Sequence, residues 1–191
     1  MTSQTVEIAG LEWTTSNLSV ACFANGDQIP HIESKKDWVE ALEQSIPAWC
    51  YYENNTDNLS IYGRLYNWFA VVDERGLAPD GWRIPSDEDW RRTVNAVGPY
   101  ELAGKLLKSR NLWEPSNHQG IDSLGFCALP GGYRNFYGDF FYLERHAYFW
   151  STTEHYDRLA WYHTMDLHTN SIMRYYNIKG NGFSCRLVRE K

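Results

Sequence analysis

The sequence predicts a single α+β domain over residues 1–191, with helices in the first two thirds and a mostly antiparallel sheet region towards the C-terminus. Before residue 110, apolar side chains recur at helical spacing in several segments, whereas after Gly125 they recur in short strand-like runs. Helices and strands that occupy separate parts of a chain are typical of α+β folds, not of parallel α/β folds. A length of 191 residues suits one sizeable core.

The N-terminal quarter predicts a hairpin, a turn and a helix. Residues 6–18 alternate apolar and polar side chains around Gly10, which is typical of a hairpin. Asn25-Gly26-Asp27 is a turn signal, and the residue before Pro30 is expected to be extended. Ser34 is a candidate N-cap for a helix that continues to about Gln44. Its expected buried face consists of Trp38, Leu42 and either Val39 or Ala41.

The next segment predicts a strand, a loop and a second helix. Residues 49–52 form a compact aromatic strand. Residues 53–58 are a polar loop that could hold an ion, although such side chains mostly bond their own backbone, which favours a solvated loop. Residues 63–72 predict a buried helix because four large apolar residues recur at helical spacing: Leu65, Trp68, Phe69 and Val72. Residues 76–82 form a turn.

The strongest local signal is a capping box at Ser86, with Asp87, Glu88 and Asp89 in the first helical turn. Trp90, Val94 and Val97 then supply one buried face. An acid/base pair at Asp87 and Asp89 is the alternative, but helix starts are often acidic, so we prefer the cap.

A second short helix is expected over residues 103–107, with Lys105 and Lys108 on its exposed side. Residues 111–122 are then a loop anchored by Trp113. Five strands follow, at residues 126–129, 148–151, 159–165, 172–176 and 183–188.

Composition excludes some partners. A net charge of −6 argues against nucleic acid, whose binding draws on clustered Lys and Arg. No apolar run approaches the ~20 residues that span a bilayer, so no transmembrane segment is expected. The start Met1-Thr2-Ser3-Gln4 lacks an export signal, although a chain trimmed of its leader would look the same. Compartment and oligomeric state stay open.

The cysteines are far apart and form no Cys-x-x-Cys pair, a poor spacing for structural zinc: Cys22, Cys50, Cys127 and Cys185. We expect free buried thiols, while a disulfide stays open because it requires a close Cα approach.

Ordered sequence blocks resemble the Fibrobacter succinogenes major paralogous domain family along nearly the whole chain. They are Ile8-x-x-Leu11-x-Trp13, Trp49-Cys50-Tyr51-Tyr52, Tyr62-Gly63-Arg64-Leu65-Tyr66-Asn67-Trp68, Gly81-Trp82-Arg83-Ile84-Pro85-Ser86-Asp87, Gly125-Phe126-x-Ala128-Leu129-Pro130-Gly131-Gly132-Tyr133-Arg134, Phe149-Trp150-Ser151-x-Thr153-Glu154 and Gly182-Phe183-Ser184-x-Arg186. The resemblance implies a C-type lectin-like fold whose segment at about residues 129–189 displays a ligand-binding face.

C-type lectin-like domains of this kind include the variable target proteins of diversity-generating retroelements, whose C-terminal codons are rewritten at adenines. Asparagine codons rewritten in this way can encode nine residues found here after residue 154: His155, Tyr156, Asp157, Arg158, His163, His168, Tyr175, Tyr176 and Asn177. The resemblance therefore implies a diversified segment, and ordinary drift at exposed positions is the alternative.

We expect a non-catalytic protein that binds a protein or glycan ligand on another cell or particle surface without a cofactor. Tyr and His bring large contact area with a polar tip, which suits adaptable recognition. The exposed face is predicted to contain His155, Tyr156, Asp157, Arg158, His163, His168, Tyr175, Tyr176 and Asn177, with Arg134, Tyr137, Tyr142 and His146 beside it. Trp150, Trp161, Phe149 and Phe183 are expected to pack in the core.

Three other functions remain alternatives. The segment Glu114-Pro115-Ser116-Asn117 resembles the Glu-Pro-Asn triplet of calcium-dependent lectins but departs from it at Ser116. A structural module of a surface assembly would bury the aromatic face against another chain. The fold is shared with formylglycine-generating enzymes, but Cys185 has no cysteine close to it in sequence, and no hydrolase, zinc-protease or phosphate-loop motif occurs.

Overall fold

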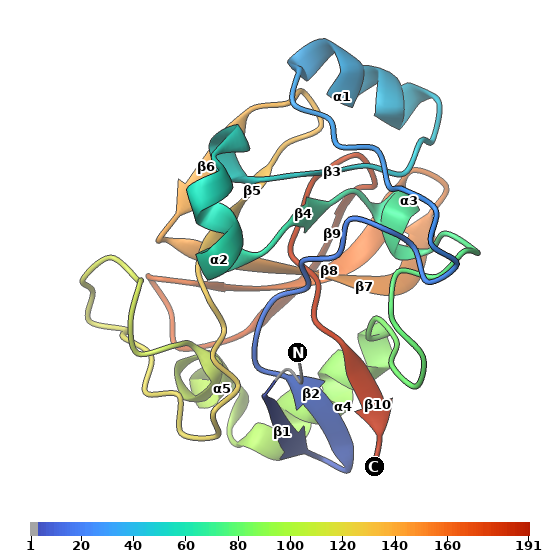
Figure 1. The fold of residues 1–191 in the computed structure, drawn as a ribbon. Coiled ribbons are helices and arrows are strands. Elements are labelled where there is room, and N and C mark those ends of the chain that lie inside the picture. The colour runs from blue at the N-terminus through green and yellow to red at the C-terminus, as the bar shows by residue number, and fades with distance from the viewer. Residues whose placement is uncertain (1–3) are drawn as a thin grey trace.

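The computed structural model describes residues 4–191. Met1, Thr2 and Ser3, which belong to the stretch where no export signal is expected, lie outside the described residues. The fold is mixed, with short helices and several small antiparallel sheets, and most strand residues lie towards the C-terminus (Figure 1). The predicted order of helices first and main sheet later is therefore confirmed.

The helices are α1 (Lys35–Glu43), α2 (Leu59–Tyr62), α3 (Trp68–Val71), α4 (Asp87–Val97) and α5 (Tyr100–Leu107), with 3-10 turns at Tyr52–Asn54 and Thr56–Asn58. The strands are β1 (Thr5–Ile8), β2 (Leu11–Thr14), β3 (Trp49–Cys50), β4 (Leu65–Tyr66), β5 (Gly131–Arg134), β6 (Phe140–Leu143), β7 (His146–Tyr156), β8 (Leu159–Asp166), β9 (Met173–Ile178) and β10 (Val188–Glu190).

The sheet β1-β2-β10 brings the two ends of the described chain together (Figure 1). β1 and β2 form the predicted hairpin, and β10 pairs with the other edge of β2, with Val188 opposite Trp13. Ala9 and Gly10 have φ values of 58° and 73°, the positive values of a type I′ turn, whose twist suits a two-residue hairpin. The C-terminus thus completes a sheet that the N-terminus begins.

The sheet β7-β8-β9 lies between two hydrophobic cores. Side chains alternate along β7, so that Tyr148 and Trp150 enter one core, while Ala147 and Phe149 enter the other. The first core also contains Tyr66, Tyr162 and Phe183, and the second contains Trp13, Trp90 and Met165. Burial on both faces explains why this part of β7 is an uninterrupted apolar run.

A fully buried arginine joins distant parts of the chain. Arg186 is 0% exposed and donates hydrogen bonds of 2.6 to 2.9 Å to Asn17 Oδ1 and to the carbonyls of Thr14, Phe126 and Cys127. Its guanidinium also lies 4.9 Å from the ring centroid of Phe126. Burial lowers the pKa of Arg186 to about 10, so the group stays charged at neutral pH. Its hydrogen bonds compensate for the cost of desolvating that charge.

Both predicted helix caps are confirmed. Ser34 Oγ accepts from the amide of Asp37 at 3.0 Å and begins α1. At α4, Ser86 Oγ accepts from the amide of Asp89, and the Asp89 carboxylate accepts from the amide of Ser86 at 2.7 Å. These local signals hold because a cap depends only on residues within one turn.

The prediction of one helix over residues 63–72 is wrong. Leu65 and Tyr66 form β4, and only one helical turn, α3, follows. The cause is Asn67, which is 1% exposed and whose Oδ1 accepts from the amides of Ala48 and Ala70. Asn67 therefore caps the N-terminus of α3 and ties this helix to the segment at Ala48, so the helix cannot extend back towards residue 63.

Three predicted strands are also corrected. Residues 49–52 pair only at β3, because the chain enters a 3-10 turn at Tyr52. Residues 126–129 make a single bridge, at Ala128, since Cys127 has a positive φ of 56°. Residues 183–187 cross between sheets through isolated bridges, and only β10 is a strand. β5 and β6 were not predicted. The predicted strands 148–151 and 159–165 lie within β7 and β8, and the predicted strand 172–176 overlaps β9 from Met173 onward.

Lys108 is buried, contrary to the expected exposure. It is 1% exposed, and its ammonium donates to the carbonyls of His118, Asp166 and Thr169 at 2.6 to 2.9 Å. Residues 109–123 fold back over the end of α5 and supply one of these acceptors. Trp113 anchors this loop as predicted, and its ring centroid lies 5.1 Å from the Lys108 ammonium.

Replacing Arg186 with methionine is expected to lower the free energy of unfolding by about 3 kcal/mol or more, because four acceptors lose their donor in the interior. Urea denaturation measures this loss. Arg189→Met is the matched control, since Arg189 stacks on Trp82 at 4.5 Å and bonds Glu12 at the surface. The control is expected to cost about 1 kcal/mol or less. Equal losses in the two variants would contradict this role of Arg186.

Candidate functional site

The sheet β7-β8-β9 divides the predicted binding residues between two faces. Trp161 pairs with Tyr176, and Tyr162 pairs with Tyr175. Directly opposed residues share a face, whereas sequence neighbours in a strand point to opposite faces. Tyr175 and Tyr176 therefore point in opposite directions from β9, which is an edge strand of its sheet. The single face expected from the sequence is two surfaces that meet at this edge.

The first surface is the Trp161 cluster, which consists of His155, Tyr156, Trp161, Arg174 and Tyr176. The His155 ring centroid lies 4.1 Å from those of Tyr156 and Tyr176 and 4.4 Å from that of Trp161. The Arg174 guanidinium lies 3.3 Å from the Trp161 centroid. Tyr156 and Tyr176 are 67% and 50% exposed, so the cluster presents aromatic side chains to solvent.

Asp87 at the start of α4 anchors this cluster. Its Oδ1 accepts from Arg174 Nε at 2.7 Å and lies 3.1 Å from His163 Nε2. Burial alone would raise the pKa of Asp87, but the hydrogen bonds from His163 and Arg174 outweigh burial and lower that pKa to about 2. The carboxylate is therefore charged at neutral pH and fixes Arg174 against Trp161.

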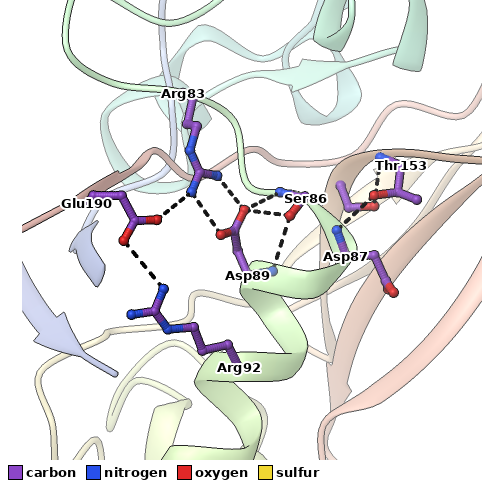
Figure 2. Close-up of polar contacts among 8 residues, drawn as sticks. Arg83, Ser86, Asp87, Asp89, Arg92, Thr153 and Glu190 are labelled. Atoms are coloured by element: carbon purple, nitrogen blue, oxygen red, sulfur yellow. Dashed lines mark hydrogen bonds and ion pairs between the residues drawn. The ribbon is translucent and has the colours of Figure 1, made fainter. Parts of the chain in front are cut away.

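The paired-carboxylate alternative for Asp87 and Asp89 finds no support in the geometry. Asp89 is engaged elsewhere, by Ser86 and by the Arg83 guanidinium, which also bonds Glu190 (Figure 2). The Asp87 amide instead donates to Thr153 Oγ1 at 3.0 Å, and the Asp87 carboxylate bonds His163 on β8 and Arg174 on β9. Each acid thus serves a different ion-paired cluster.

The second surface is the Tyr148 cluster, which consists of Tyr133, Tyr142, His146, Tyr148, Tyr162 and Tyr175. Tyr142 lies 4.5 Å from His146 between ring centroids, and His146 lies 5.6 Å from Tyr148. Tyr148 lies 5.9 Å from Tyr162, which lies 6.2 Å from Tyr175. Burial raises the pKa of Tyr162 to about 12, so its hydroxyl is neutral. The inner rings join one core, while Tyr142 and Tyr175 reach solvent.

Two predicted face residues are buried, and their expected exposure is corrected. Arg134 is 0% exposed, lies 4.5 Å over Trp38 and donates to the carbonyls of Ile32 and Glu33. His163 is 2% exposed because β8 places it between Asp87 and the Trp90 ring, which lies 5.2 Å away. Burial lowers the pKa of His163 and favours the neutral imidazole. His163 thus lies beneath the Trp161 cluster, whereas Arg134 ties β5 to the segment before α1.

The remaining predicted residues lie around the two clusters. Tyr137 is exposed in the β5–β6 turn, Asp157 and Arg158 are exposed in the β7–β8 turn, and His168 is exposed after β8. Asn177 is half-buried in β9 and accepts from the amide of Ile178. Exposure permits contact by these residues, and their binding role stays a prediction.

The sequence interpretation missed two members of the Trp161 cluster. Trp161 was assigned to the core, but it is only half-buried because β8 extends beyond the second core. Arg174 was not considered, although a basic residue that precedes two tyrosines in a strand could have signalled an outward-facing side chain.

Comparison with known proteins identifies the family. The model of the Fibrobacter succinogenes major domain matches residues 6–189. The chain belongs to this family. No curated protein and no solved structure matches the chain.

In this Fibrobacter succinogenes major domain, His155, His163 and His168 are not arranged together as metal ligands. His155 belongs to the Trp161 cluster, His163 lies beneath it and His168 follows β8. Within residues 4–191, no group of three or more His, Cys, Asp or Glu side chains is arranged to hold a metal ion. Glu114, from the lectin-like triplet, lies 3.5 Å from Arg145 Nε.

The four cysteines of this family member are free thiols, as expected. Cys50 and Cys185 are fully buried, whereas Cys22 and Cys127 are partly exposed. Burial raises the pKa of the Cys185 thiol, which disfavours the reactive thiolate.

No helix in the described part of the chain is long and apolar enough to span a membrane.

Asp87→Asn is expected to release Arg174 and disorder the Trp161 cluster, because the neutral amide removes the charged acceptor. Asp89→Asn is the matched control, since Asp89 is also in the first turn of α4 but bonds Arg83. Amide and arginine Nε–H NMR spectra measure the effect. The Arg174 Nε–H signal should exchange at least tenfold faster with water in the Asp87 variant and be unchanged in the Asp89 variant. An unchanged Arg174 signal in the Asp87 variant would contradict the anchoring role.

Proposed function

We propose that this chain is a non-catalytic binding protein with a C-type lectin-like fold, whose C-terminal segment recognises a protein or glycan on another cell or particle surface. Exposed aromatic residues gather in this segment, and the proposal rests on this observation. Of the seven exposed large aromatic residues in the described chain, six lie between positions 137 and 176: Tyr137, Phe141, Tyr142, Tyr156, Tyr175 and Tyr176.

Exposed tyrosines suit recognition for a physical reason. A tyrosine offers a large apolar ring and a hydroxyl while fixing few rotatable bonds, so little conformational entropy is lost on binding. Tyr156 ends β7, which is buried on both sides further along, and Tyr175 and Tyr176 lie on β9, which pairs with β8. The positions of these three rings are therefore set before a ligand arrives. Preorganisation of this kind favours affinity.

The edge of β9 is the proposed centre of the contact. Tyr175 and Tyr176 are each 50% exposed on opposite faces of the strand. A ligand that covers this edge meets the Tyr148 cluster on one side and the Trp161 cluster on the other. The residues proposed to contact it are Tyr142, His146, His155, Tyr156, Asp157, Arg158, Tyr175, Tyr176 and Asn177, with Tyr137 and His168 at the periphery.

We also propose that the segment is the diversified region of a retroelement target. The outward-facing residues carry amino acids that asparagine codons can yield by changes at adenine. The residues beneath them, such as Asp87 and Trp90, lie well before the segment and would stay constant. A fixed support with exchangeable exposed residues is compatible with such diversification, because surface substitutions usually change stability by only about 0.5 kcal/mol.

Replacing Tyr156, Tyr175 and Tyr176 together with alanine is expected to abolish binding with little loss of stability, because all three rings are at least half exposed. The measurement is flow cytometry of the labelled protein on a panel of bacterial cells and phage-coated beads, with urea denaturation in parallel. Tyr100→Ala is the control, since Tyr100 is 53% exposed on α5 outside the segment.

Pretreatment of the targets and the buffer separates the alternatives. Protease-sensitive binding indicates a protein ligand and periodate-sensitive binding a glycan, and loss on calcium chelation would favour the calcium-dependent lectin. If the triple variant binds as the parent does, the proposed face is wrong. A structural module predicts instead that the tyrosines are covered by another subunit in the native assembly.

Sequencing of the gene's neighbourhood tests diversification. We expect a reverse transcriptase gene and a near-copy of the last ~60 codons, with mismatches confined to adenines of the copy and concentrated at outward-facing positions. A near-copy with mismatches at all four bases, or no copy at all, would contradict the diversification proposal and leave a binder with a fixed sequence.

A further inference from the structure

Six arginines in the described chain lie over aromatic rings, and five of them have a hydrogen-bond acceptor within the chain. Arg75 is bonded to Asp73 and Asp27, Arg174 to Asp87, and Arg189 to Glu12, while Arg134 and Arg186 are bonded to carbonyls. Arg64 differs, because none of residues 4–191 accepts a hydrogen bond from its side chain or forms an ion pair with it.

Arg64 is held firmly although its side chain is unpaired. Its guanidinium carbon lies 4.1 Å from the Trp49 ring centroid and 5.7 Å from that of Tyr51. Its Nε is buried without an acceptor among the described residues. The buried Nε is closed to a ligand, whereas the two terminal nitrogens are not buried and have no acceptor among the described residues. A carboxylate placed on these terminal nitrogens would balance the charge of the guanidinium.

The support beneath Arg64 is rigid. Trp49 also stacks on the His31 ring, with 4.0 Å between centroids and 5° between planes, and its indole N–H donates to the Ile29 carbonyl at 3.0 Å. The Tyr51 ring meets both His31 and Trp49 edge-on at 5.1 Å. The Arg64 amide donates to the Leu18 carbonyl at 3.1 Å. Both the ring and the backbone that position the guanidinium are therefore fixed.

We propose that Arg64 is the recognition residue of a second binding site, which takes a carboxylate through the terminal nitrogens of the guanidinium. A planar carboxylate matches two parallel N–H groups of the planar guanidinium. Stacking on Trp49 leaves the edge of the guanidinium, not its face, for this contact.

The local charge favours a carboxylate over a phosphate dianion. Arg64 supplies one positive charge, and burial lowers the pKa of His31, so that imidazole adds none at neutral pH. Glu33 lies 3.7 Å from His31 Nε2 and brings a negative charge to the same region. A single negative charge balances this site better than two.

The test is an NMR titration of 15N-labelled protein with sodium acetate, with sodium chloride at equal ionic strength as reference. We expect a saturable shift of the Arg64 Nε–H signal and of the Trp49 indole signal. Arg64→Gln should weaken acetate binding at least tenfold, measured on the indole signal. Arg75→Gln is the matched control, since Arg75 also stacks on a ring, Phe23, at 4.1 Å but is already paired. It should leave acetate binding unchanged.

A charge-conserving variant and further ligands test the site independently. Arg64→Lys keeps the charge but not the two parallel donors, so it should bind acetate several-fold more weakly than the parent even if the glutamine variant folds poorly. A glutamate-containing peptide and galacturonate distinguish a protein carboxylate from a sugar carboxylate by which of the two binds more tightly. A response to acetate that matches chloride, or that survives in Arg64→Gln, overturns the site. Tighter binding of inorganic phosphate than of acetate overturns the carboxylate assignment.

Discussion

The buried guanidinium of Arg186 is the contact on which the arrangement of the chain depends. It bonds the carbonyl of Thr14 and the side chain of Asn17 near the N-terminus, and the carbonyls of Phe126 and Cys127 near the middle. Arg186 fixes the chain just before β10, where it comes back to pair with β2. The part of the C-terminal segment before Arg186 can therefore extend outward as β7, β8 and β9. A charge without a bonding partner here would be expelled to water, so packing and hydrogen bonding must form together.

Buried cations do in this fold what regular sheets do elsewhere. Much of the chain between the strands is irregular, and irregular backbone leaves carbonyls that still require donors. Lys108 satisfies three of them, Arg134 satisfies those of Ile32, Glu33 and Gly138, and Arg186 satisfies three more. Long basic side chains reach several loops at once, so they connect segments that no ladder joins. This explains how small sheets can support a stable chain of this length.

Local signals in the sequence predicted local structure, and long-range contacts account for the errors. The capping box at Ser86 and the hairpin about Gly10 depend on near neighbours and were predicted correctly. Asn67, Lys108, Arg134 and His163 look like exposed or helical residues in sequence, but each is buried by partners tens of residues away. The division of the predicted binding residues between two faces was within reach of the sequence, since Tyr175 and Tyr176 are adjacent in a strand and must face opposite ways. The pairing of Arg174 with Asp87 was not, because the two residues lie on β9 and α4, far apart in the sequence.

Arg174 and Arg64 show how the same side chain can serve different purposes according to its partner. Both stack on a tryptophan, and stacking alone orients a guanidinium without neutralising it. Asp87 neutralises Arg174, so this arginine stabilises the surface on which His155, Tyr156 and Tyr176 are displayed. Arg64 has no such partner in the described chain, so its charge is available to a ligand. If residues around β9 are exchanged as proposed and so change the specificity, the cation of Arg64, just before β4, can contribute a constant share of the affinity, because its support on Trp49 lies outside the C-terminal segment.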